Sequence, residues 1–162
     1  MMNELTAKIY PSCDAFFNTL KMWKTSNQKL VFTNGCFDLL HRGHIDSLLK
    51  SAALGDKLIV GLNTDRSVKQ LKGSKRPLMD EQARALMLAA LQMVDAVILF
   101  DEETPYDLIK FVQPDVLVKG NEYAIEEIAG YDIVLARGGT VETIELTKGY
   151  STSALIQQIK DL

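Results

Sequence analysis

Two histidines in one short motif carry the strongest chemical signal in this sequence. His41 and His44 are the only two histidines of the chain, and both lie in TNGCFDLLHRGH, residues 33–44. Because this motif leads into a predicted helix, their spacing of three residues places both imidazoles on one helical face. The first-turn amides and the dipole of such a helix favour negative charge. A phosphate chain is therefore the ligand we expect at this motif.

Transfer of a phosphoryl or nucleotidyl group is chemistry that such a motif can support. It requires positioning and donors aimed at the charge that grows on phosphate oxygens. A helix N-terminus lowers the pKa of a nearby histidine, yet a neutral imidazole still donates one hydrogen bond. A zinc site would need ligands beyond these two histidines. No GxGxxG follows a predicted strand, so hydride chemistry is not expected. We predict catalytic roles for His41 and His44, and a structural role is the alternative.

A basic stretch, KQLKGSKRP, follows the second predicted strand. Its cationic residues are Lys69, Lys72, Lys75 and Arg76. Taken alone, a charge run is most often a solvated face. Residues after a strand of a parallel sheet lie on the ligand side, however, and the glycine, serine and proline here predict a mobile loop. We predict that Lys72 neutralises charge in the transition state and that Arg76 clamps a substrate phosphate.

Two further segments are weaker signals. GYSTS, residues 149–153, precedes the last predicted helix, and hydroxyls and amides at a helix start can hold phosphate oxygens. The alternative is a plain N-cap, which Ser151 would satisfy by itself. VKGNEY, residues 118–123, ends the fourth predicted strand, and its glycine, Gly120, could admit a base or a ribose.

Short apolar runs separated by helical patterns dominate the rest of the chain. The expected strands are 30–32, 57–62, 96–100, 115–118 and 140–146, and the expected helices are 11–25, 45–54, 81–92, 105–112, 125–137 and 151–160. Strands that lack alternation are typical of a parallel sheet covered on both faces. We therefore predict an α/β fold, a Rossmann-like parallel sheet of about five strands with helices on both faces. Ligands of such folds bind beyond the carboxyl ends of the strands.

The amino-acid composition limits the cellular compartment and the binding partners that we expect for this protein. A net charge of −3 over 162 residues argues against nucleic acid as a partner. Cys13 and Cys36 lack metal-type spacing and are expected to be free thiols in a reducing compartment. The N-terminus resembles no signal peptide, and no apolar stretch could span a membrane, so we expect a cytoplasmic protein without a membrane partner.

Five motifs together resemble the cytidylyltransferase-like nucleotidyltransferases, whose marks are an HxGH motif and a Ser/Thr-rich motif before a late helix. They are FTNGCFDLLHRGH, LKGSKRPL, VDAVILFDEETP, PDVLVKGNEY and GYSTSALI. Within this family the motifs are similar to the adenylyltransferases of ADP-heptose synthesis. That activity occurs as a separate protein or as the C-terminal domain of a bifunctional heptose-phosphate kinase/adenylyltransferase. The resemblance covers residues 28–160, and the lack of a kinase half suggests the stand-alone form.

The resemblance implies a domain organisation and a reaction. Residues 29–162 would form the nucleotidyltransferase domain, after an N-terminal helical extension, 1–28, that packs within the chain or across a homodimer. The substrates would be ATP and D-glycero-D-manno-heptose 1-phosphate, giving ADP-heptose, a precursor of the lipopolysaccharide core or a related heptose glycan, and pyrophosphate. Mg²⁺ would accompany the nucleotide, without metal ligands from the protein.

The same resemblance implies roles for individual residues. His41 and His44 would stabilise the transition state at the α-phosphate, Lys72 would contact phosphates, and Asp38 would orient the motif. The nucleotide-binding residues would be Asn34, Gly35, Cys36, Phe37, Lys119, Gly120, Ser151, Thr152 and Ser153.

Two departures from the family pattern leave alternatives open. Gln157 and Gln158 occupy a stretch where family members often carry an arginine, so we predict no arginine contact with the leaving pyrophosphate there. Asn121 and Glu122 follow Gly120 in place of the more frequent glycine-aspartate pattern, which leaves the base preference open. One alternative is a CTP-dependent cytidylyltransferase acting on glycerol 3-phosphate or a phosphoalcohol. The other is a non-catalytic nucleotide-binding module. Class I aminoacyl-tRNA synthetases carry related motifs, but this chain is too short and too acidic for tRNA.

Overall fold

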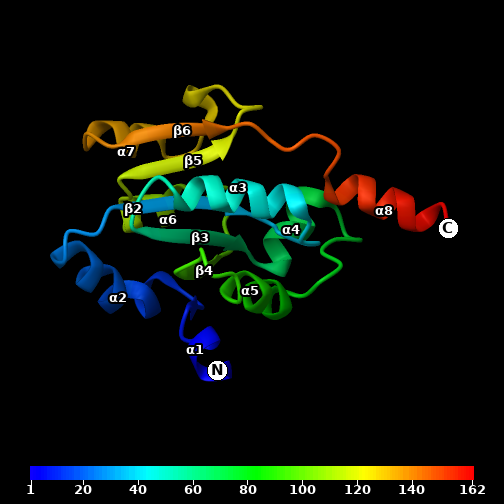
Figure 1. The fold of residues 1–162 in the computed structure, drawn as a ribbon, viewed down its shortest axis with the longest axis horizontal. Coiled ribbons are helices and arrows are strands. Elements are labelled where there is room, and N and C mark those ends of the chain that lie inside the picture. The colour runs from blue at the N-terminus through cyan, green and yellow to red at the C-terminus, as the bar shows by residue number, and fades with distance from the viewer.

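A six-stranded sheet organises the molecule, and the computed structural model describes all residues, 1–162 (Figure 1). Its strand order is β1-β4-β3-β2-β5-β6, and every neighbouring pair is parallel. The strands are β1 Ile9–Tyr10, β2 Leu30–Gly35, β3 Lys57–Asn63, β4 Ala96–Phe100, β5 Val116–Gly120 and β6 Thr140–Ile144. The predicted α/β fold with a parallel sheet is confirmed, with one strand more than the pattern indicated.

Helices cover both faces of the sheet, so each central strand is buried on both sides. The helices are α1 Met2–Thr6, α2 Cys13–Thr25, α3 Arg42–Ala52, α4 Asp65–Lys72, α5 Glu81–Ala89, α6 Tyr106–Val112, α7 Tyr131–Ala136 and α8 Thr152–Lys160, with a 3₁₀ helix η1 at Ile125–Glu127. Helices α2, α6 and α7 pack in one apolar core with Leu30 and Phe32 of β2. Helices α3 and α5 pack in the other core with Val31. None of the helices is both long and apolar enough to cross a membrane.

The first 28 residues contribute to the sheet and to its core. Strand β1 pairs with β4 at the edge of the sheet. The side chains of Phe16 and Leu20, both from α2, are buried in the core on that side. Ser12 caps α2, because its side chain accepts a hydrogen bond from the Ala15 amide at 3.3 Å. This segment therefore packs within the chain.

The basic stretch differs from the loop that the sequence led us to expect. Its first half is helix α4, which Thr64 caps by accepting a hydrogen bond from the Ser67 amide at 3.2 Å. Val68 of this helix is fully buried, so packing holds a segment whose composition is mostly polar. Lys72 is the last residue of α4, and Gly73 ends it with φ of 94°. The predicted helix over 125–137 is also broken, since Gly130 adopts φ of 85° before α7.

Candidate active site

The histidine motif lies beyond the carboxyl end of β2, where the neighbours of β2 are β3 on one side and β5 on the other. Helix α3 begins at Arg42, with His41 as its N-cap residue. The rings of His41 and His44 are stacked, with 3.8 Å between their centroids and 20° between their planes. Phe37, which adopts φ of 46°, places its ring 5.2 Å from that of His44. The two imidazoles therefore form one stack at the start of a helix.

Both stacked rings carry a buried nitrogen without a partner. The Nδ1 atoms of His41 and His44 are buried and make no hydrogen bond. A buried polar atom left unpaired costs about 1–3 kcal/mol, so native proteins rarely retain one without a role. No side chain caps the first turn of α3 either. This unmet hydrogen-bonding capacity is what a site that awaits an anionic ligand presents.

Burial keeps both imidazoles neutral. It lowers the pKa of His44 to about 4, and the charge of His41 acts in the same direction, while a backbone hydrogen bond to Leu39 opposes them. Burial also lowers the pKa of His41. A neutral imidazole has one donor and one acceptor nitrogen. At pH 7 the stack can therefore donate to phosphate oxygens without carrying a positive charge.

The serine- and threonine-rich segment lies against the histidine motif. A Cβ atom at Gly43 would lie 3.0 Å from the His41 ring and 3.3 Å from the Tyr150 Cβ, which is closer than side chains ordinarily pack. Thr152 Oγ1 donates a hydrogen bond to the Leu39 carbonyl at 3.5 Å. Ser151 caps α8 by accepting a hydrogen bond from the Ala154 amide at 3.1 Å. This is the N-cap role that the sequence analysis gave as the alternative for Ser151. Ser153 follows in the first turn of α8 and is exposed.

Lys119 lies near the end of β5, and Lys72 lies at the end of α4. Lys119 Nζ donates a hydrogen bond to Asn34 Oδ1 at 3.0 Å. Burial lowers the pKa of Lys119, and the positive charge of Lys72 acts in the same direction. Burial raises the pKa of the Cys36 thiol, and the charge of Lys72 is the largest effect that opposes it. Lys72 itself is exposed. The structure thus brings Asn34, Cys36, Lys72 and Lys119 into one neighbourhood.

Side chains lie beside Gly35 and Gly120, two of the predicted nucleotide-binding residues. A Cβ atom at Gly35 would lie 3.0 Å from the ring of Phe37. A Cβ atom at Gly120 would lie 2.8 Å from the carboxylate of Glu122. Phe37 and Glu122 therefore occupy the side of each glycine toward which a Cβ atom would point.

Asp38 is almost fully buried and ties the motif to the segment before α5. Its carboxylate accepts hydrogen bonds from Arg76 Nε at 2.5 Å, from the Leu78 amide at 2.8 and 3.0 Å, and from the Met79 amide at 2.9 Å. Burial alone would raise the pKa of Asp38, but the Met79 and Leu78 amides and the Arg76 guanidinium outweigh it and hold the pKa below its usual value. The terminal nitrogens of Arg76 make no hydrogen bond, so Asp38 orients that guanidinium without using all its donors.

The Asp38→Asn variant should be destabilised by about 2–3 kcal/mol at pH 7, since an amide cannot match a carboxylate with charged and backbone donors. Because the native pKa of Asp38 lies below the unfolded value of 3.8, its contribution to stability is present above pH 3.8 and is lost as the pH falls through the native pKa. Urea unfolding at pH 7 and pH 3 measures both effects. Equal stabilities of wild type and variant at pH 7 would contradict the role of Asp38.

Arg84 is a site residue that we did not predict from the sequence. Its side chain is fully buried, and its guanidinium donates to the carbonyl oxygens of Cys36 at 2.6 Å and Asn63 at 2.8 Å. It also donates to the Met79 carbonyl at 3.0 Å and to Asp65 Oδ1 at 2.8 Å. One arginine therefore joins the ends of β2 and β3, the start of α4 and the segment before α5. The only sequence signal was a single charge inside the apolar run ARALMLAA.

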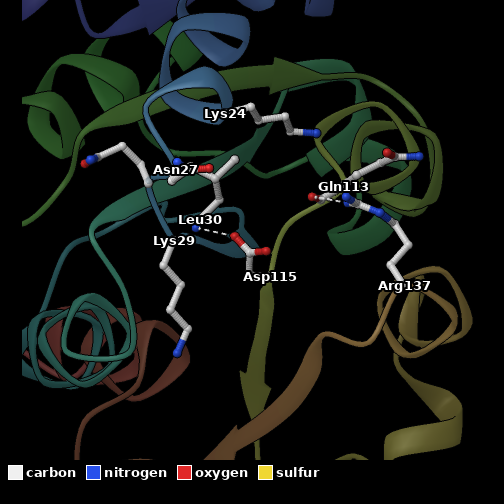
Figure 2. Close-up of a pocket in the computed structure, with 8 residues that line it drawn as sticks. Lys24, Asn27, Lys29, Leu30, Gln113, Asp115 and Arg137 are labelled. Carbon is white, nitrogen blue, oxygen red and sulfur yellow. Dashed lines mark hydrogen bonds between the residues drawn. The ribbon is translucent and has the colours of Figure 1, made fainter.

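A polar cavity lies at the opposite edge of the sheet. It has a volume of about 430 Å³ and is formed around the amino ends of β2 and β5, where Leu30 and Asp115 lie (Figure 2). The histidine motif lies at the carboxyl end of β2, so this cavity is not part of the candidate active site.

The parallel sheet and the motif at its carboxyl edge define a nucleotide-binding α/β protein. The family model described as cytidylyltransferase-like matches residues 32–158. The chain belongs to the cytidylyltransferase-like family, which makes it a nucleotidyltransferase by class.

The curated relatives of this chain share one name. The chain is similar to "Bifunctional protein HldE" of Azorhizobium caulinodans, at 54% identity over 85% of this chain and 29% of the relative. It is similar to the protein of that name from Nitrobacter hamburgensis, at 48% identity over 93% of this chain and 31% of the relative. The protein of that name from Citrifermentans bemidjiense is 52% identical over 90% of this chain and 30% of the relative. The chain thus spans about three tenths of the length of these relatives.

Solved structures share the fold. A lipopolysaccharide core biosynthesis protein from Thermoplasma volcanium GSS1 has a TM-score of 0.61 and 31% identity, covering 76% of this chain and 99% of that one. Pantoate-beta-alanine ligase from Francisella tularensis, solved with beta-gamma ATP and beta-alanine, has a TM-score of 0.63 over 95% of this chain and 72% of that one. At 16% identity, the second likeness concerns the fold alone.

Proposed function

We propose that this chain is an adenylyltransferase that transfers AMP from ATP to D-glycero-D-manno-heptose 1-phosphate, giving ADP-heptose and pyrophosphate. The observation that carries the transferase chemistry is the stack of His41 and His44, with two buried, unpartnered Nδ1 atoms at the carboxyl edge of the sheet. The heptose substrate rests on the likeness to the HldE proteins and on the five sequence motifs. We also infer synthesis of lipopolysaccharide precursors, in keeping with the name of the Thermoplasma relative.

In the proposed reaction a phosphate oxygen of the heptose 1-phosphate attacks the α-phosphorus of ATP. A new phosphorus–oxygen bond forms as the bond from the α-phosphorus to the bridging oxygen breaks, and pyrophosphate takes the electron pair. The attacking phosphate is already ionised, so no general base is required. His41 and His44 donate hydrogen bonds to the α-phosphate oxygens as charge grows on them. Lys72 neutralises that charge from the end of α4.

The other candidate residues bind the two substrates. The terminal nitrogens of Arg76 face no protein acceptor, so they can hold the phosphate of the sugar while Asp38 fixes the guanidinium. Thr152 and Ser153 lie at the start of α8 and would contact the triphosphate, together with the Ser151 amide. Asn34, Cys36 and Phe37 follow β2, and Lys119 and Gly120 end β5. These two groups would bind the adenosine between them.

The proposal includes Mg²⁺ carried by the triphosphate. The chain has no group of three or more histidine, cysteine, aspartate or glutamate side chains placed to hold a metal ion. Asp38, the one carboxylate within the motif, already accepts hydrogen bonds from Arg76 and from backbone amides. We also propose that the protein is cytoplasmic, an environment in which free thiols such as those of Cys13 and Cys36 persist. A homodimer stays a prediction.

Pyrophosphate release tests the proposal. The purified chain is assayed with ATP or CTP against both anomers of heptose 1-phosphate and against glycerol 3-phosphate, with Mg²⁺ present. We expect turnover with ATP and one heptose anomer. Turnover only with CTP and glycerol 3-phosphate would replace the proposal with the cytidylyltransferase alternative. ATP binding without turnover on any acceptor would favour the non-catalytic module.

A further inference from the structure

The cavity at the amino edge of the sheet is polar and rich in cations. Eight residues line it, and only Leu30 among them is hydrophobic. Lys24 comes from the last turn of α2, Lys29 precedes β2, and Arg137 follows α7. A second cavity of about 280 Å³ is lined by Lys29, Arg137 and Asp115 as well. The two cavities therefore share three charged residues, and Lys24 lines only the first.

Positive charge exceeds negative charge in this cavity. Lys24, Lys29 and Arg137 are its cations, and Asp115 is its one carboxylate. Asp115 Oδ2 already accepts a hydrogen bond from the Leu30 amide at 2.7 Å. None of the three cations takes part in an ion pair.

Most hydrogen-bond donors of these cations are free. Arg137 uses one terminal nitrogen, which donates to the Gln113 carbonyl at 2.6 Å. The ammonium groups of Lys24 and Lys29 donate to no protein acceptor. Figure 2 shows the side chains of Lys24 and Arg137 approaching the cavity from different elements, with Asp115 between β2 and the loop that enters β5.

Lys24 and Arg137 repel each other across the cavity. Burial lowers the pKa of Lys24, the positive charge of Arg137 lowers it further, and Asp115 opposes both. Two cations that face one partly buried space repel each other, and the single carboxylate of Asp115 offsets only part of this positive charge. An anion seated there would relieve the repulsion and supply acceptors to the free donors.

We propose that this cavity binds a small anion that carries a phosphate group, at a site separate from the candidate active site. The planar guanidinium of Arg137 suits two oxygens of one phosphate, and the lysines add charge from either side. The polar lining speaks against an apolar ligand, and the volume suits inorganic phosphate or a small phosphate monoester. The proposal does not depend on the reaction proposed above.

The fluorescence of Trp23 can report binding at this site. Trp23 is the only tryptophan of the chain and directly precedes Lys24. Its carbonyl oxygen accepts a hydrogen bond from the amide of Gln28, a lining residue, at 3.0 Å. Inorganic phosphate is titrated at constant ionic strength while Trp23 fluorescence and the Tm are followed. We expect a saturable change in emission with half-saturation at about 1 mM or below, and a Tm that rises with phosphate.

Three variants assign the signal to the cavity. Lys24→Ala and Arg137→Ala should each weaken binding at least about tenfold, since each removes a charged phosphate contact. Lys21→Ala is the matched control, because Lys21 is an exposed lysine of the same helix that does not line the cavity. Lys72→Ala separates this site from phosphate bound near the histidines. The response of Trp23 should persist in Lys21→Ala and in Lys72→Ala.

A titration with glucose 6-phosphate distinguishes a phosphate monoester from free phosphate, and saturation by either supports the proposal. Three results would each overturn it. The first is no saturable response to either compound. The second is an equal response to sodium chloride at the same ionic strength. The third is a response that both Lys24→Ala and Arg137→Ala retain in full.

Discussion

Replacement of His44 by alanine should lower kcat at least about a hundredfold, while nucleotide binding changes much less. The ring of His44 is stacked on that of His41, and its buried Nδ1 atom has no protein partner. Its hydrogen-bonding capacity is therefore free for the reacting phosphate, and its loss should be felt in the transition state more than in the ground state. Steady-state pyrophosphate release and calorimetric ATP binding measure the two effects separately.

Leu49→Ala provides the control for this variant, because Leu49 is an exposed residue of the same helix, α3. It should leave kcat within about twofold of wild type, since exposed substitutions rarely disturb a distant site. His44→Gln keeps a side-chain donor and should retain more activity than His44→Ala. Unchanged kcat in His44→Ala would remove the assigned role of the histidine stack.

The neutral state of the stack also predicts a pH dependence. The native pKa of His44 is about 4 and that of His41 is lowered, so any histidine titration in the pH profile of kcat should lie below the ordinary value of 6.5. Because the native pKa of His44 lies below the unfolded one, its contribution to stability is present above pH 6.5 and is lost as the pH falls toward 4. This loss should be smaller in His44→Ala than in wild type.

Replacement of Arg84 by leucine should lower the free energy of unfolding by about 3–5 kcal/mol, which corresponds to a fall in Tm on the order of 10 °C. The substitution leaves three carbonyl oxygens without their donor and Asp65 without its buried cation. Thermal unfolding followed by circular dichroism measures the change. If Arg84→Leu does not fold, Arg84→Lys retains the charge without the planar fork and should lie between it and wild type.

Arg66→Ala is the matched control for Arg84→Leu. Arg66 also pairs with an aspartate, Asp101, but its side chain is 73% exposed. An exposed pair of this kind contributes about 0–1 kcal/mol. Should Arg84→Leu and Arg66→Ala melt at the same temperature, the buried guanidinium would not be the link between the strand ends that we infer.

Elements whose pattern is local could be predicted from the sequence. Strand β4 coincides with the expected run 96–100, because a strand buried on both faces must be apolar throughout. Helix α2, Cys13–Thr25, lies within the expected range 11–25. Strand β1, by contrast, has only two residues, Ile9–Tyr10, and so has no periodicity to detect. It exists through its pairing with β4, almost ninety residues further along the chain.

The prediction of a loop over the basic stretch was wrong for a related reason. Its charges and its glycine indicated a loop, and the residues that make it a helix act through tertiary contacts. Val68 is fully buried, and the side chain of Thr64, the cap residue, also donates a hydrogen bond to Asp101. Polar composition alone does not report either contact, so Lys72 was expected on a loop and lies at the end of a helix.

By itself the sequence determined the class of the fold, the edge of the sheet that carries chemistry, and the two imidazoles, because residue type and short-range spacing carry that information. Only the tertiary structure decided how those groups are held. The pairing of Asp38 with Arg76 and the contact of Arg84 with Cys36 join residues 38 and 48 positions apart. The cationic cavity likewise gathers Lys24, Asp115 and Arg137 from separate elements. Such contacts depend on where the packed sheet places each side chain, and no local pattern in the chain records that placement.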